Sequence, residues 1–243
     1  MNRSTLKPLY LDGAVAAPVS VQLDGPALKV LKPGRCAGRY PLRLLSRVMV
    51  SGAVEWAMPA LLACLRNGIV VSFLDKNGEF VGMCIGASPG KAELSDRLQE
   101  FALRPDWPHH YARWYTAMER RGILRLVKSF GLRSEDLRPA TVRRSIVQHM
   151  ARIAPAQIIR NTLNHLESAV SACAARTALD RGISSTLLVD EGAGYQLIRD
   201  LGRLLAWETP AMAAQLLIKE GNQGLPCKKD LANAVEAEHD QLF

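Results

Sequence analysis

Short apolar stretches separated by turn residues occupy the first part of the chain. Residues 9–11, 19–23 and 28–31 are apolar runs divided by Asp-Gly and Pro-Gly turns, and residues 44–50 form a further run that ends at a Ser-Gly pair. Strand-length runs at this spacing predict a series of short strands joined by tight turns. We therefore expect a β-meander in the N-terminal region.

The next stretch changes from strand to helix and back. Residues 55–66 carry apolar side chains at helical spacing and stop at Asn67-Gly68, a common helix C-terminus. Residues 69–74 are a continuous apolar run, which predicts a strand buried on both faces. Lys76-Asn77-Gly78 predicts a hairpin turn, and residues 80–85 then form the last strand.

Helical periodicity governs the remainder of the chain. Residues 86–90 (GASPG) predict a linker, and several prolines separate the apolar-periodic segments that follow. The predicted helices are 94–103, 111–130, 140–153, 156–178, 194–206 and 212–219. The fold class is therefore α+β, with an N-terminal β-rich domain (1–86) followed by an all-helical domain (91–243).

Positive charge is concentrated in the first half of the helical region. The chain carries 31 Lys and Arg against 23 Asp and Glu, a net charge of +8. Residues 88–165 contain fourteen of the basic residues, twelve of them Arg, against seven acidic ones, so this segment alone holds a net +7. Arginine's planar fork suits phosphate. A nucleic-acid partner is the prediction, and a solvated basic surface is the alternative.

The helix predicted at 111–130 carries much of this charge. Its basic residues cover a broad polar face, while Trp114, Ile123, Leu124 and Val127 can face inward. The face is either simply solvated or contacts phosphates. Our candidate nucleic-acid-binding residues are Arg113, Arg120, Arg121, Arg125, Lys128, Arg143 and Arg144.

Cysteine usage and apolar content bear on the compartment. Five cysteines at wide spacing, with no CxxC pair, are typical of reduced thiols in a cytoplasmic protein. The N-terminus shows no signal peptide, and no stretch approaches the roughly 20 apolar residues of a membrane span. The sequence also lacks GxxxxGK[ST], HExxH, GxSxG and zinc-binding spacings.

Four segments of the β-rich region follow one another in an order known from a protein family. They are residues 9–11 (LYL), 44–54 (LLSRVMVSGAV), 60–69 (ALLACLRNGI) and 71–82 (VSFLDKNGEFVG). In this order they resemble the N-terminal β-domain of the CRISPR-associated protein 1 family, the CRISPR adaptation integrases. The resemblance implies dimerisation through the β-domain and DNA binding through the helical domain.

The helical region resembles the same family in three places. Residues 163–170 (LNHLESAV), 179–183 (LDRGI) and 195–203 (YQLIRDLGR) resemble consecutive family motifs, and Asp200 stands where the family has a metal-binding aspartate. The resemblance implies a Glu/His/Asp site for Mg²⁺ or Mn²⁺, ions that stabilise the charge of phosphoryl transfer. The resemblance thus makes Asp200 the candidate catalytic and metal-binding residue.

The sequence offers no clear counterpart for the other two ligands of that site, the glutamate and the histidine. The family histidine falls near Val189, and no histidine lies between Gly182 and Pro210. Glu119 is the nearest counterpart of the glutamate, within an Arg-rich run. Asp190 is a candidate to supply a second carboxylate to the metal, or it belongs to an acidic loop.

Three hypotheses remain open. The chain is an adaptation integrase homologue that binds and integrates double-stranded or branched DNA, or a catalytically inert DNA-binding or scaffold protein with the same fold. The third is an unrelated basic α+β protein. The first two imply a homodimer and the small CRISPR adaptation partner protein as partners, and no membrane.

Overall fold

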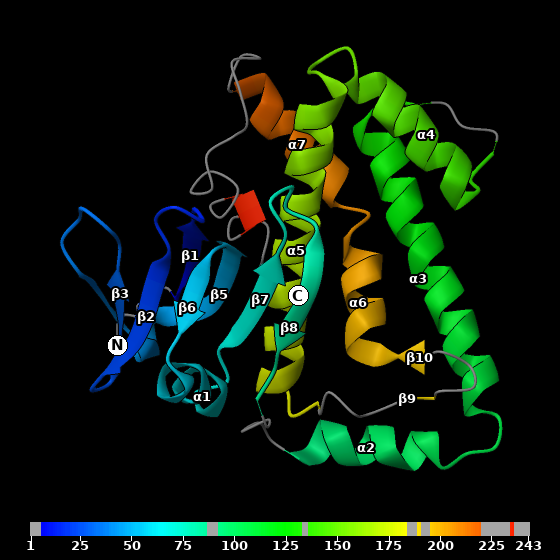
Figure 1. Cartoon of the computed structure of the whole chain (residues 1–243). Coiled ribbons are helices and arrows are strands. Elements are labelled where there is room, and N and C mark those ends of the chain that lie inside the picture. Colours follow the sequence, from blue (N-terminus) through cyan, green and yellow to red (C-terminus); the bar gives the residue numbers. More distant parts are fainter. Residues whose placement is uncertain are drawn as a thin grey trace, which may run out of the picture.

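A computed structural model describes residues 6–86, 92–132, 136–183, 189–190, 195–219 and 234–235. Strands gather in the N-terminal part and helices in the remainder, as Figure 1 shows, which confirms the predicted α+β class. Two four-stranded sheets lie side by side at one end of the molecule, and long helix α5 stands between them and the other helices.

The first sheet is mostly parallel. It has the order β1-β5-β7-β8, with β1 parallel to β5, β5 parallel to β7, and β8 antiparallel to β7. Its strands are β1 (Lys7–Gly13), β5 (Leu45–Gly52), β7 (Val70–Leu74) and β8 (Phe80–Cys84). The predicted run at 69–74 is thus a central strand, flanked on both sides by other strands.

The second sheet has the order β4-β3-β2-β6. Its strands are β2 (Val19–Asp24), β3 (Ala27–Leu31), β4 (Gly38–Pro41) and β6 (Val54–Trp56). A 3₁₀ turn, η1 (Leu42–Leu44), leads from β4 to β5, and helix α1 (Met58–Arg66) follows β6. The inner face of this sheet packs with α1 around a core that includes Val21, Leu28 and Cys64.

The predicted meander is therefore wrong in its topology. Of the first four strands, β2, β3 and β4 form consecutive antiparallel pairs, whereas β1 pairs in parallel with β5 in the other sheet. The helix predicted from residue 55 begins at Met58, because Pro59 occupies its first turn and residues 54–56 pair with β2. Strand β4 has no apolar alternation, and the sequence pattern does not predict it.

The helices follow the predicted order with shifted ends. They are α2 (Ala92–Ala102), α3 (Trp107–Ser129), α4 (Pro139–Met150), α5 (Ala156–Asp180), α6 (Leu197–Leu205) and α7 (Thr209–Lys219). A short hairpin of β9 (Val189–Asp190) and β10 (Tyr195–Gln196) precedes α6, where the sequence predicted helix from residue 194. The predicted linker lies outside the described residues, except for Gly86.

Strand β7 is buried on both faces, as its apolar run predicts. Val70 and Leu74 belong to the core shared with the helices, whereas Val71 belongs to the core between the two sheets. Since α5 and α1 supply this cover within one chain, the buried run by itself gives no reason to expect a second subunit. The homodimer, like the boundary between residues 86 and 91, stays a prediction.

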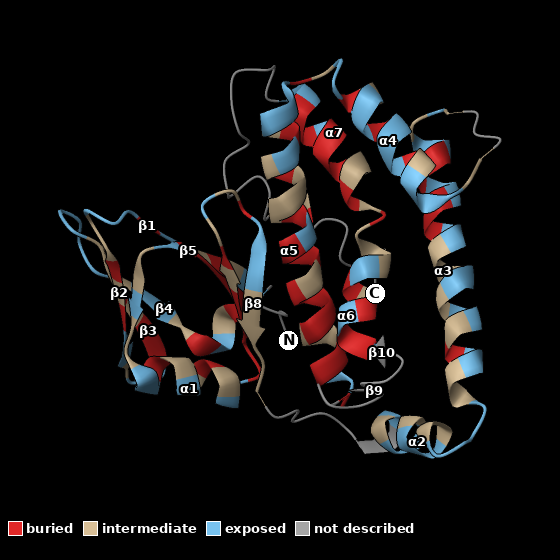
Figure 2. Ribbon diagram, turned by 45° about the vertical axis from the view of Figure 1, so that its right-hand side comes forward, coloured by how far each residue is buried: buried red, intermediate tan, exposed pale blue. Residues whose placement is uncertain are grey.

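Two arginines connect the sheets to α5. Arg47 of β5 is 1% exposed and donates from Nη1 to Cys173 Sγ at 2.9 Å. Arg176, one turn from the end of α5, donates from Nη1 to the Gly68 carbonyl oxygen at 2.6 Å. The sheet and the helical layer are therefore joined by polar contacts as well as by apolar packing, as the buried stripe along α5 in Figure 2 also shows.

No disulfide bond joins the described cysteines, which is consistent with the reduced thiols that the sequence predicts. Cys36 is exposed, while Cys64 and Cys173 are buried, and Cys227 lies outside the described residues. Burial raises the pKa of the Cys64 thiol to about 12, so this group stays protonated and unreactive at neutral pH. Within the described residues, no helix is long and apolar enough to cross a membrane.

Gly78 at the β7–β8 turn should be hard to replace, because the turn presses against α5. Its φ is +79°, and a Cβ there would lie 2.0 Å from His165 Nδ1. We predict that Gly78→Ala destabilises the fold by about 1–3 kcal/mol in urea unfolding. Gly34 has a similar φ of +69° but open space around it, so Gly34→Ala should cost only the smaller backbone strain. Equal losses in the two variants would contradict the contact.

Candidate functional site

Asp200 lies in the first turn of α6. It is buried, and hydrogen-bond donors of the protein surround its carboxylate. The residue is 4% exposed. Its Oδ2 accepts a hydrogen bond from the Tyr111 hydroxyl of α3 at 3.0 Å and one from the backbone N–H of Gln196 at 3.3 Å. A buried carboxylate needs such donors, since it has lost the water that would otherwise solvate it.

A positively charged side chain lies next to the other carboxylate oxygen, Oδ1. Arg203 follows one turn later on α6, and its Nη1 lies 3.5 Å from Asp200 Oδ1. The Arg203 side chain is half exposed, so it reaches Asp200 from the solvent side. The two oxygens of Asp200 therefore face a phenol, a peptide N–H and a guanidinium, all of them hydrogen-bond donors.

Tyr115, one turn beyond Tyr111 on α3, is a phenol whose pKa responds to Asp200 and to a second carboxylate. Burial raises the pKa of the Tyr115 phenol, and the negative charges of Glu119 and Asp200 raise it further. Arg203 and Arg143 oppose this shift. Glu119 follows Tyr115 by one turn of α3, so the two side chains lie on the same face of that helix.

Arg143 of α4 extends this cluster toward α5. Its guanidinium stacks over the ring of the buried Trp207, 4.7 Å from the centroid. It also acts on Glu167 of α5: partial burial raises the pKa of the Glu167 carboxyl, and the charge of Arg143 lowers it. Figure 1 shows α6 between α5 and α3, with α4 beside the upper end of α3.

A cavity of about 610 Å³ opens on the opposite side of α6, between β8 and α5. Glu167 and Asn164 line it from α5, and Arg199 and Arg203 line it from α6. Arg203 thus contacts both Asp200 and the cavity. Asp200 itself is not among the lining residues, because it faces α3.

The residues around Asp200 do not fit a resident divalent ion. Mg²⁺ takes oxygen ligands, and Asp200 presents its oxygens to three donors instead. Within the described residues, no group of three or more His, Cys, Asp and Glu side chains could hold a metal ion. The sequence supplies no histidine between Gly182 and Pro210.

For Asp190 the structure describes only the position of the backbone. It lies in β9 opposite Tyr195 of β10, in the hairpin that leads into α6. Its role as a metal ligand stays a prediction.

The seven predicted nucleic-acid-binding residues are all exposed. Five lie on α3 and two on α4. Arg125 forms an ion pair with Glu208 at 3.0 Å, and Arg143 stacks on Trp207. The other five form no ion pair with a described residue: Arg113, Arg120, Arg121, Lys128 and Arg144. They present free positive charge along one side of the helical layer.

The predicted inner face of α3 is partly wrong. Ile123 and Val127 are buried as predicted, but Trp114 and Leu124 are 37% and 47% exposed. No sequence pattern assigned Arg203 or Glu167 to a site. Arg203 could have been found from its spacing, because it lies three residues after Asp200 on a predicted helix. Glu167 could not, because it is far in sequence from Arg143.

Comparison with known proteins identifies the family. The family described as CRISPR associated protein Cas1 matches residues 15–174, about two thirds of the chain. No curated protein sequence matches. The chain belongs to the Cas1 family, as the motifs of the β-rich region predict.

Solved structures share the fold at low sequence identity. TM1797, a CAS1 protein from Thermotoga maritima, superimposes with a TM-score of 0.68 at 11% identity, over 97% of this chain and 89% of that one. A casposase bound to integration product gives 0.64 at 13%, over 98% and 82%. The crystal structure of a TtCas1–DNA complex gives 0.61 at 13%, over 98% and 91%.

Tyr111 should contribute to stability through Asp200. We predict that Tyr111→Phe lowers the free energy of unfolding by about 1–3 kcal/mol, because a buried carboxylate oxygen loses its phenol donor. Tyr115→Phe is the matched control: it lies one turn away, is half-buried, and forms no hydrogen bond with a described residue. Urea unfolding followed by circular dichroism measures both. A loss in Tyr115→Phe as large as in Tyr111→Phe would argue against this role of the hydrogen bond.

Proposed function

We propose that this Cas1-family protein binds double-stranded or branched DNA through the basic side of α3 and α4, and that it does so without divalent-metal catalysis. The observation that carries the proposal is the environment of Asp200. Its carboxylate accepts hydrogen bonds from Tyr111 and from the backbone N–H of Gln196, and it forms an ion pair with Arg203.

Charge and exposure support DNA as the ligand. Arg113, Arg120 and Arg121 lie on a 23-residue helix with their side chains free of described carboxylates. Guanidinium groups in such positions neutralise phosphates with little loss of existing contacts. Two of the solved structures that share this fold are a casposase bound to integration product and a TtCas1–DNA complex.

The cation beside Asp200 supports the absence of metal chemistry. A guanidinium at 3.5 Å already compensates the negative charge on this carboxylate. A divalent ion would have to displace Arg203 and compete with two hydrogen bonds while gaining one ligand. Mg²⁺ surrenders its waters reluctantly and normally takes ligands from several groups.

An active integrase is the second candidate function, and one observation favours it. The negative charges of Glu119 and Asp200 both raise the pKa of Tyr115, so both carboxylates act on the same phenol. If Arg203 moved away on DNA binding, those carboxylates are the ones that could share Mg²⁺ or Mn²⁺. A homodimer and the small adaptation partner protein fit either function and rest on the family resemblance.

DNA affinity should depend steeply on salt. We predict that Arg113→Ala/Arg120→Ala/Arg121→Ala weakens binding to any duplex and reduces the slope of log K against log salt by about 1 for each arginine. Fluorescence anisotropy with unrelated duplexes of about 30 base pairs measures this. Arg138→Ala is the control, because Arg138 is exposed but paired with Asp136. A flat salt dependence in the wild type would refute the proposed DNA binding.

Metal-dependent strand cleavage or transfer should be absent. We predict no turnover on branched or duplex DNA with Mg²⁺ or Mn²⁺, and no difference between the wild type and Glu119→Gln. Without a fixed ion, the charge of the transition state loses stabilisation that is worth a factor of about one hundred or more in rate. Robust turnover that disappears in both Glu119→Gln and Asp200→Asn would establish the second candidate, provided that both variants keep the wild-type circular dichroism spectrum.

A further inference from the structure

A groove at the outer corner of the second sheet is lined by three arginines and no acidic residue among the described ones. It has a volume of about 870 Å³ and lies where the β2–β3 turn, β4, η1 and the end of α1 meet. Arg39, Arg43 and Arg66 line it together with apolar residues such as Pro26 and Pro41. We call it the corner groove.

Two of these arginines have no counter-charge among the described residues. Arg43 and Arg66 are exposed and form neither an ion pair nor a side-chain hydrogen bond with a described residue. They come from separate elements, η1 and the last turn of α1, yet the fold places them around one groove. Two free guanidiniums that face a shared space are suited to an anionic group between them.

The adjoining strands add further positive charge. Arg39 pairs with Asp24 at 3.3 Å, but it also stands directly opposite Lys29 in the β3–β4 ladder. Like charges in directly opposed positions destabilise a sheet. An anion bound along this edge would relieve that repulsion, so the ladder favours a ligand with charge spread over several groups.

We propose that the corner groove is a second nucleic-acid-binding surface, which takes the phosphate backbone of a DNA strand. Its volume falls in the range of ligand pockets and exceeds the needs of a lone ion. Arginine forks match phosphate in two-point contacts, and the apolar wall of Pro26 and Pro41 can pack against sugars. The proposal rests on the proposed function only in naming nucleic acid as the ligand.

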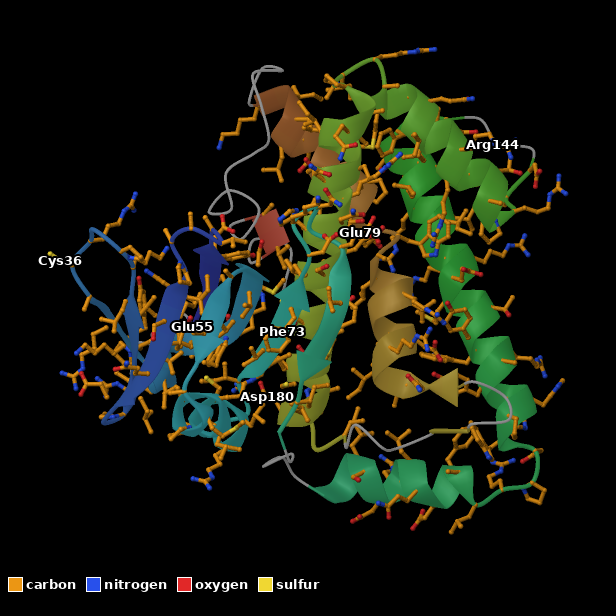
Figure 3. All side chains as sticks on the ribbon, viewed as in Figure 1. Cys36, Glu55, Phe73, Glu79, Arg144 and Asp180 are labelled. Atoms are coloured by element: carbon orange, nitrogen blue, oxygen red, sulfur yellow. The ribbon has the colours of Figure 1, made fainter. Side chains whose placement is uncertain are left out.

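The corner groove lies apart from the basic side of α3 and α4. Figure 2 shows β4 and α1 at one end of the molecule and α3 and α4 at the other, and Figure 3 shows Arg144 on α4 far from the strands of the second sheet. The two surfaces can therefore be tested separately by substitution. A contact at the corner groove adds a DNA segment beyond the one held by the helices.

Photo-cross-linking tests the contact directly. A benzophenone amino acid replaces Pro26, an exposed residue that lines the groove, in the full chain with the same fluorescent duplex. The same amino acid replaces Met58, which is 62% exposed at the other end of α1, as the control position. We expect a covalent DNA adduct from position 26 and none from position 58. Adding Arg43→Ala/Arg66→Ala should abolish the adduct.

Affinity gives the second readout. Arg43→Ala/Arg66→Ala should reduce the salt slope by about 2, which is about one unit for each arginine that no longer neutralises a phosphate. Lys7→Ala/Lys76→Ala removes the same charge from two exposed sites outside the groove and should leave the slope nearly unchanged. Thermal unfolding verifies that all variants fold.

The outcomes separate this inference from the proposed function. No adduct at position 26, or an adduct that survives Arg43→Ala/Arg66→Ala, overturns the corner groove even if the α3 variant loses affinity. If the groove instead binds an acidic protein, position 26 should likewise give no DNA adduct. Conversely, an adduct that depends on Arg43 and Arg66, with no effect of the α3 substitutions, supports the corner groove and refutes the proposed role of α3.

Discussion

The burial of α5 is the constraint on which the rest of the structure depends. This 25-residue helix packs against the first sheet on one side and against α6 and α7 on the other. Its buried positions are mostly small, with alanines at 169, 172, 174, 175 and 178, so neighbouring backbones can come close. Gly202 of α6 is one result: a Cβ there would lie 2.9 Å from Ser171 Oγ. The position of α6, and with it that of Asp200, follows from this close approach.

Asp200 shows how the groups around a buried carboxylate determine what that carboxylate does in a fold. Its carboxylate ties α6 to α3 through Tyr111 and is neutralised by Arg203. Such an arrangement turns a candidate ligand into a structural anchor, since removing any donor leaves a buried charge poorly compensated. The same fold leaves free arginines elsewhere on the surface. The arginines proposed to contact DNA and the residues around Asp200 are therefore separate sets, which can be substituted independently.

The sequence predicts what local patterns encode. The α+β class, the strand at 69–74 buried on both faces and the order of the helices all follow from periodicity and turn residues. Strand β6 falls inside a predicted helix because three residues carry too little pattern, although Pro59 marks the true helix start. Parallel pairing of β1 with β5 depends on contacts about 40 residues apart. The contact of Tyr111 with Asp200 spans 89 residues, which no local spacing reveals.

Strand β7 gives the molecule a property that neither half would have alone. Alternate side chains of one five-residue strand enter two different cores, Val70 and Leu74 on one side and Val71 on the other. Pulling the strand out of either core exposes apolar surface in both. The two halves should accordingly lose their structure in a single cooperative transition rather than one after the other. Cutting the chain between them would leave a strand with one face bare, which is a template for aggregation rather than an independent domain.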